Sequence, residues 1–117
     1  AGFTGVSPVR VLDSRIGLGV AQAKLGPGRS VTLSVPDLPA GATAVALNVT
    51  VTNPTAAGNL TVFPGGQSLP VASNLNFVAG QSIPNMVVVP LGPGSTVTFY
   101  NSAGTVDVIA DVLGYFR

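Results

Sequence analysis

The sequence contains no cysteine, histidine, glutamate or tryptophan. Without cysteine there are no disulfides, no thiolate metal ligands and no cysteine nucleophile. Without histidine the chain lacks the commonest general base and the commonest metal ligand. Asp107 and Asp111 lie four residues apart in an extended segment, roughly 13 Å apart on one face, which exceeds the carboxylate spacing of ~6.5–9.5 Å in inverting glycosidases. We therefore expect that the protein is not an enzyme.

Charged residues are also scarce, at 8% of the chain against a usual ~25%. The net charge is +1, and the basic residues are scattered, so no electrostatic footprint for nucleic acid or an anionic membrane is present. No apolar run approaches the ~20 residues of a transmembrane helix. We expect no nucleic-acid partner and no membrane insertion. The low charge, with 15 Gly, 10 Pro and many Thr, Ser and Asn residues, favours an extracellular or cell-surface location.

What the sequence does contain is alternation of apolar and polar residues. A chain of 117 residues, 46% apolar, has the size of one domain, which we expect to span 1–117. The longest clean alternation opens the segment Ala42–Pro64, where Val45, Leu47, Val49 and Val51 face one way, as in a strand with one buried face. The pattern breaks at 53–58 and resumes at 59–64, which predicts a hairpin with a six-residue loop.

Several further segments alternate in the same way, separated by Gly- and Pro-rich turns, and no segment has a helical period. This spacing predicts an all-β protein, an antiparallel β-sandwich of about seven or eight strands. A jelly-roll-like or immunoglobulin-like order is favoured over a closed barrel. Asn101–Gly104 is predicted to be a second hairpin loop. The remaining predicted strands are 8–15, 29–36, 72–77, 85–91, 95–101 and 105–116.

The densest polar cluster is Asp13-Ser14-Arg15, where the first predicted strand ends. In the interpretation we favour, Asp13 or Asp111 accepts a bidentate bond from Arg10 or Arg15, and this ion pair joins the first strand to the last. The alternative is a calcium site, the one cofactor that the sequence suggests, in which Asp13 is joined by Asp111 or asparagine side chains.

Asparagine and threonine side chains on the outward faces of the strands are the best candidates for ligand binding. Their amides and hydroxyls can hydrogen-bond sugar hydroxyls, although they equally suit turns and solvated strands. Phe63 and Tyr100 fall on the outward parity and are candidates for an aromatic platform under a sugar ring; the alternative is that they cover loops. The candidate ligand-binding residues are Asn48, Thr50, Asn59, Thr61, Phe63 and Tyr100.

Four long segments carry a family resemblance: PVRVLDSR, AVALNVTVTNPTAAGNLTVFP, ASNLNFVAGQSIPNMVVVPLG and VTFYNSAGTVDVIADVLGYF. They resemble the β-rich extracellular modules that occur in tandem, or C-terminal to secreted proteases and hydrolases, in actinobacteria and related bacteria. The resemblance spans Val9 to Phe116. It implies a secreted or surface-attached, non-catalytic accessory module, and it supplies no assigned binding residues.

Two functions follow from this resemblance and from the outward faces. The first is binding of cell-wall or environmental polysaccharide. The alternative is a structural spacer or a self-assembling subunit of an extracellular surface fibre. Self-association is suggested by the apolar run Met86–Val89, which suits a strand that faces a partner.

Overall fold

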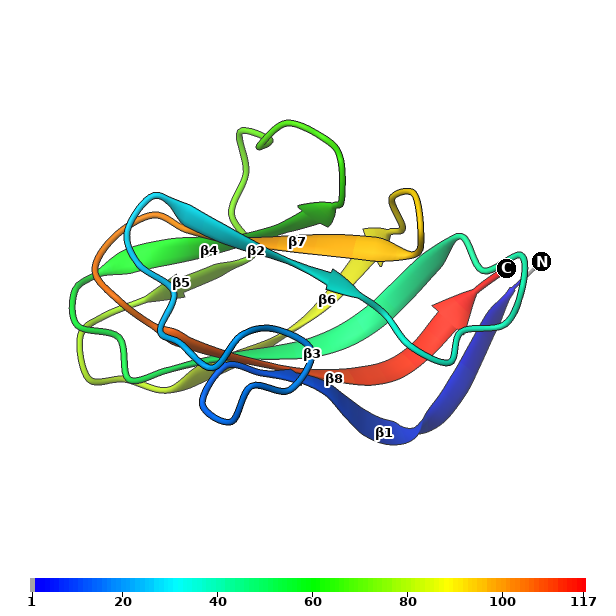
Figure 1. The fold of residues 1–117 in the computed structure, drawn as a ribbon, viewed down its shortest axis with the longest axis horizontal. Helices are drawn as coiled ribbons and strands as arrows, with labels where there is room; N and C mark the ends of the chain where they lie inside the picture. The colour runs from blue at the N-terminus through cyan, green and yellow to red at the C-terminus, as the bar shows by residue number, and fades with distance from the viewer. Residues whose placement is uncertain (1) are drawn as a thin grey trace.

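Residues 2–117 are described by a computed structural model in which two four-stranded antiparallel sheets pack face to face (Figure 1). The structure confirms the predicted all-β sandwich, and no helix occurs in the described residues. One sheet has the order β1-β8-β3-β6, and the other has the order β2-β7-β4-β5. The strands are β1 (Phe3–Asp13), β2 (Arg29–Ser34), β3 (Ala44–Thr52), β4 (Gly58–Pro64), β5 (Leu75–Phe77), β6 (Ile83–Pro90), β7 (Thr96–Asn101) and β8 (Asp107–Phe116).

The strand pairing is nested. The first strand pairs with the last, β2 with β7, β3 with β6, and β4 with β5. This order arises when a long antiparallel hairpin rolls up into two sheets, and it is that of a jelly roll. In an immunoglobulin-like sandwich the first strand does not pair with the last. The jelly-roll alternative is therefore the one observed, and the immunoglobulin-like alternative is wrong.

The core lies between the two sheets and follows the predicted alternation. Val45, Leu47, Val49 and Val51 of β3 are fully buried there, together with apolar side chains of the opposite sheet such as Phe99. Burial of each such side chain stabilises the fold by roughly 1.5–3 kcal/mol. Because successive side chains of a strand point to opposite faces, the polar residues between them lie on the outer faces of the sandwich.

A β-bulge adjusts this alternation in β1. The register with β8 shifts between Arg10 and Leu12, so that Val11 and Leu12 both enter the core. As a consequence, Arg10 and Asp13 both lie on the outer side of the sheet, although their separation in a regular strand would place them on opposite sides.

The two predicted hairpins are wrong, because in each case the flanking strands belong to different sheets. β3 and β4 lie in opposite sheets, as do β7 and β8. Strands of the two sheets each bury one face in the same core, from opposite sides. A connection that crosses from one sheet to the other therefore has the same alternation of apolar and polar residues as a hairpin. At the β7–β8 crossing the side-chain amide of Asn101, fully buried, donates to the carbonyls of Leu25 and Gly104 at 3.0 and 2.9 Å.

Candidate functional site

The outer face of the sheet β2-β7-β4-β5 is lined with hydroxyl and amide groups. These side chains alternate along their strands with core residues such as Leu33, Val62 and Phe99, so they point away from the core. We call this surface the hydroxyl face. It consists of Ser30, Thr32, Ser34, Asn59, Thr61, Asn76, Thr96, Thr98 and Tyr100, none of which is charged.

Tyr100 lies in the middle of the hydroxyl face. The strand register places it directly between Ser30 of β2 and Thr61 of β4. One position along, the hydroxyls of Thr32 and Thr98 share a hydrogen bond of 2.9 Å. Asn59 is opposite Asn76 on the far side. Groups on neighbouring strands are ~4.8 Å apart, so hydrogen-bonding groups surround one aromatic ring in this part of the face. Of these groups Ser30, Thr32 and Asn76 are exposed and Asn59 is partly exposed, whereas Thr61 and Thr98 are buried.

Two of the predicted ligand-binding residues on this side are covered. Thr61 is 3% exposed, and its hydroxyl donates to the carbonyl of Ala72 at 2.8 Å. Phe63 is 7% exposed. The segment between β4 and β5 rises above the sheet on this side (Figure 1). Phe63 is therefore a buried side chain and offers no open platform, whereas Asn59 and Tyr100 remain partly exposed.

The structure separates the remaining two candidates from this group. Asn48 and Thr50 belong to β3 and lie on the outer face of the other sheet, opposite Asp111 and Ile109 of β8. The predicted ligand-binding residues are therefore divided between two faces on opposite sides of the core. The cause is the wrong hairpin, since β3 and β4 would share an outer face only within one sheet.

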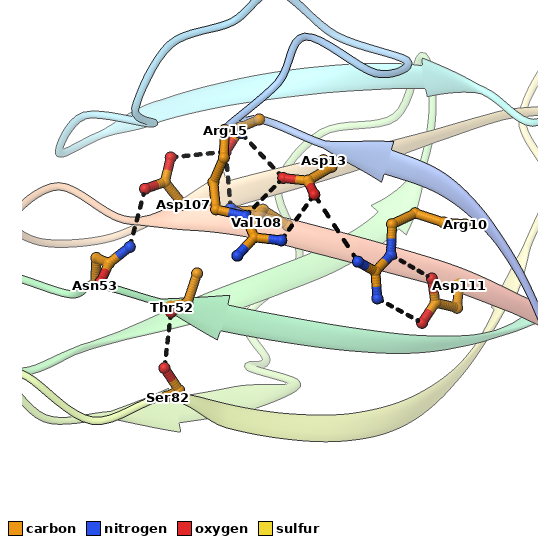
Figure 2. Close-up of polar contacts among 10 residues, drawn as sticks. Arg10, Asp13, Arg15, Thr52, Asn53, Ser82, Asp107, Val108 and Asp111 are labelled. Carbon is orange, nitrogen blue, oxygen red and sulfur yellow. Dashed lines mark hydrogen bonds and ion pairs between the residues drawn. The ribbon is translucent and has the colours of Figure 1, made fainter.

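The outer face of β1-β8-β3-β6 carries the ion pairs (Figure 2). Arg10 of β1 binds Asp111 of β8 through two contacts, from Nε at 2.9 Å and from Nη2 at 3.4 Å. Arg10 also lies 4.0 Å from Asp13. This is the strand-joining pair favoured from the sequence. We call this surface the ion-pair face.

Asp13 is held mainly by its neighbour in the following loop. The guanidinium of Arg15 donates to both carboxylate oxygens, at 3.0 and 2.9 Å, and the backbone N–H of Arg15 donates to Oδ1 at 3.0 Å. The side-chain hydrogen bonds from Arg15 hold the pKa of Asp13 below its ordinary value, against burial, which favours the neutral form.

Asp107, at the start of β8, is the centre of a second cluster that the sequence did not reveal. It is 4% exposed and accepts hydrogen bonds from Ser14 at 3.0 Å, Lys24 at 2.6 Å and Asn53 at 3.4 Å. Ser14 in turn accepts from the backbone N–H of Val108. Burial alone would raise the pKa of Asp107, but the hydrogen bonds from Lys24, Ser14 and Asn53 together hold it below its ordinary value. Of these residues, Ser14 could have been identified from the sequence, because it lies in the Asp-Ser-Arg motif.

These contacts engage both aspartates of the predicted calcium site, Asp13 and Asp111. Residues 2–117 contain no group of three or more acidic, histidine or cysteine side chains placed to hold a metal ion. Asp13 and Asp111 are each engaged by an arginine, and Arg10 lies between them. Calcium requires several oxygen ligands around one point, which this arrangement does not provide.

A recess of about 160 Å³ opens where the two sheets separate, between β1, β8 and the turn after β2. Its lining is mainly apolar, with Val6, Val9 and Leu38, and it also includes Asp37 and Tyr115. None of the predicted site residues lies in it.

The chain matches no protein-family model and no curated protein. Among residues 2–117, no helix has the length and apolar character needed to cross a membrane. The hydroxyl face is therefore the candidate site on structural grounds. Asn59 and Tyr100 were identified from the sequence, but Ser30 and Thr32 were not included. These two could have been found as the polar, outward-facing residues of the alternating segment 30–34.

Proposed function

We propose that this protein is a non-catalytic, extracellular or cell-surface accessory module that binds neutral polysaccharide through the hydroxyl face. The observation that carries the proposal is the uncharged array of hydroxyls and amides around Tyr100. A neutral polysaccharide offers alternating hydrogen-bond donors and acceptors, which serine, threonine and asparagine side chains match in either direction. The resemblance to modules appended to secreted hydrolases favours the same ligand class.

Tyr100 gives this face a second kind of contact. A tyrosine ring combines an apolar surface with a hydroxyl at its edge, so it can pack on the apolar face of a sugar ring and hydrogen-bond at the same time. Ser30 and Thr32 lie beside it on an exposed edge strand, where a long polysaccharide chain has access. The absence of charge favours neutral glycans over sulfated or uronic-acid polymers.

A non-catalytic role is favoured by the state of the carboxylates. Asp13, Asp107 and Asp111 are each held by a basic side chain and lie on the ion-pair face, away from the candidate site. A general acid or base needs access to substrate and a pKa near the working pH. The pKa values of Asp13 and Asp107 are instead shifted further below neutrality.

The test is retention on insoluble cell wall, chitin and cellulose, together with glycan arrays. We expect wild-type protein to be retained on at least one polymer and Tyr100→Ala to lose most of that retention, because the ring is the single aromatic contact of the site. Asn48→Ala is the matched control on the opposite face and should bind as wild type does. Failure of the wild-type protein to bind any of these polymers refutes the proposal, and equal losses in both variants refute the assignment to the hydroxyl face.

One observation favours the alternative, a structural or self-assembling module. On the outer side of β6, Met86 and Val88 are 63% and 53% exposed, whereas Val87 and Val89 are in the core. Exposed apolar groups of this kind are typical of contacts with another protein. Filaments in electron micrographs, combined with no retention on any polysaccharide, would favour this function.

A further inference from the structure

A two-sheet sandwich leaves four edge strands, and edge strands expose backbone groups that can pair with another chain. Here they are β1 and β6 in one sheet, and β2 and β5 in the other. Proteins usually protect such edges with prolines, bulges, charges or short length. The four edges of this protein differ in whether they carry these protections.

Three edges are protected. β1 contains Pro8 and the charged Arg10, and its register with β8 shifts twice. β5 has 3 residues, too few for a stable new strand pair.

β6 is protected by prolines at its two ends. The N–H of Leu91 donates to the carbonyl of Thr43 at 2.9 Å, so these two residues form a hydrogen-bonded pair. From there, hydrogen-bonded and non-hydrogen-bonded pairs alternate along β6 and β3. Met86 and Val88 therefore direct their backbone groups to the open side, and so do Pro84 and Pro90, which have no N–H to donate.

The edge of β2 carries one charged residue, Arg29, at its first position, and Ser30–Ser34 have none of these protections. The N–H of Val35 donates to the carbonyl of Ser95 at 3.0 Å, and the pairing of β2 with β7 continues from there without a register shift. Because hydrogen-bonding residues alternate, Ser30, Thr32 and Ser34 direct their N–H and C=O groups away from β7. All three residues are exposed, and we find no backbone hydrogen bond from them to any other segment of residues 2–117.

We propose that β2 pairs with β2 of a second copy of this chain, antiparallel, about a two-fold axis at Thr32. The alternation permits a centred register in which Ser30 of each copy lies opposite Ser34 of the other, and Thr32 lies opposite Thr32. In each of these pairs both N–H groups donate to the carbonyl opposite, so every edge-facing donor of β2 gains a partner. The proposal concerns assembly and holds whether or not the protein binds polysaccharide.

The side chains along this edge suit a symmetric contact. At a two-fold axis a charged residue meets its own copy, which repels it, and bulky side chains meet as well. Ser30, Thr32 and Ser34 are small and uncharged. On the inner face, Val31 lies opposite Leu33 of the second copy, and both are apolar. The backbone N–H and C=O groups of this edge therefore match those of a second copy, and no like-charged side chains lie opposite each other.

Directly opposite residues of an antiparallel pair point to the same face of the sheet. The outer faces of the two copies therefore join into one hydroxyl face of twice the width. Two sites on one rigid platform would bind a polymer with increased avidity, because the second contact becomes intramolecular. Dimerisation would therefore affect binding at the candidate site, but the dimer itself does not require that the site binds a ligand.

The test is sedimentation velocity over a range of protein concentrations. We expect a reversible dimer for the wild-type protein and a monomer for Thr32→Pro, since this change removes an edge-facing N–H and leaves the bonds of β2 to β7 in place. Thr32→Val is the matched control, which loses the hydroxyl and keeps the N–H, and should remain dimeric. Val88→Thr on the edge of β6 should also remain dimeric. A wild-type protein that stays monomeric at millimolar concentration, or a folded Thr32→Pro that dimerises as the wild-type protein does, overturns the proposal.

Two further measurements apply if Thr32→Pro does not fold. Thr32→Lys places two like charges opposite each other at the axis and should also give a monomer. In the unmodified protein, hydrogen exchange at the amides of Ser30, Thr32 and Ser34 should slow as concentration rises, while exchange at Met86 and Val88 should not change. Exchange at the β2 amides that is independent of concentration contradicts pairing through this edge.

Discussion

The outer face of β1-β8-β3-β6 carries four ion pairs, whereas the hydroxyl face on the other side of the core carries none among the described residues. Both faces arise from the same alternation of apolar and polar residues. On the ion-pair face Arg10, Asp13, Asp107 and Asp111 of the strands bind one another or arginine and lysine side chains of the loop after β1, beside uncharged residues such as Asn48. On the hydroxyl face they hold serine, threonine, asparagine and tyrosine, several of which remain exposed.

The contacts of the two faces also differ in which parts of the chain they join. Ser14 bonds Asp107 across 93 positions, and Arg10 bonds Asp111 across 101, so the ion-pair face ties the first strand and its loop to the last strand. Such a contact closes a loop of almost the whole chain, and the entropy lost in closing that loop opposes it. We infer that the ion-pair face serves stability, which leaves the hydroxyl face free to serve binding. Stability measurements on matched variants of the two faces test this division.

The largest effect is expected from Asp107→Ala. The change leaves the hydroxyl of Ser14, buried beside the core, without its acceptor, and Lys24 loses its partner. Lys24 is itself half exposed and regains water, so the loss falls short of that for a fully buried pair. We expect the free energy of unfolding to fall by about 2–3 kcal/mol, measured by urea denaturation. Asp107→Asn, which keeps the shape and an acceptor oxygen, should lose less. A loss no larger than that of an exposed ion pair contradicts the structural role of this cluster.

The next effect is a loss of stability in acid. The pKa values of Asp13 and Asp107 are lower in the folded protein than in the unfolded chain, so their ionised forms stabilise the fold above the unfolded value. This contribution is lost as pH falls through the folded values. We expect the free energy of unfolding to be nearly constant from about pH 7 to pH 5 and to decrease below about pH 4.

A matched pair of variants assigns this acid response. Asp107→Asn should show a shallower decrease below about pH 4 than the wild-type protein, because one of the responsible carboxylates is gone. Asp13→Asn should also show a shallower decrease, because it removes the other carboxylate whose pKa is lowered in the folded protein. Parallel curves for Asp107→Asn and wild type would place the acid-sensitive groups elsewhere.

The fold was predictable because each strand is marked by local alternation. Each of the eight strands overlaps a predicted one, although β1 begins at Phe3 and not at residue 8, and the buried positions of β3 follow from the pattern alone. The assignment of strands to sheets was not predictable, because β3 and β4 have the same pattern whether they form a hairpin or cross between sheets. Long-range pairing is set by how the whole chain packs, and no single segment specifies it.

The candidate site was predictable in chemistry and not in position. Tyr100 and Asn59 were identified from outward parity, but Asn48 and Thr50 were grouped with them through the wrong hairpin. The scarcity of charge favoured an ion pair between the first and last strands, with Asp13 or Asp111 and Arg10 or Arg15 as its members, and the structure places Arg10 against Asp111. The Asp107 cluster did not, because Lys24 reaches it from an irregular loop that carries no periodic signal.

The smallest effects come from single changes at exposed positions, and they provide the closest comparison of the two faces. Arg10→Ala removes an ion pair whose arginine side chain is 48% exposed, so we expect a loss of only about 0.5–1 kcal/mol, reduced further at high salt. Ser30→Ala on the hydroxyl face removes a hydroxyl with no side-chain partner in the described residues, and should change stability by less than about 0.5 kcal/mol. Urea denaturation at low and high salt measures both. A larger loss for Ser30→Ala than for Arg10→Ala would show that the hydroxyl face also contributes to stability, and the division between the two faces would then be wrong.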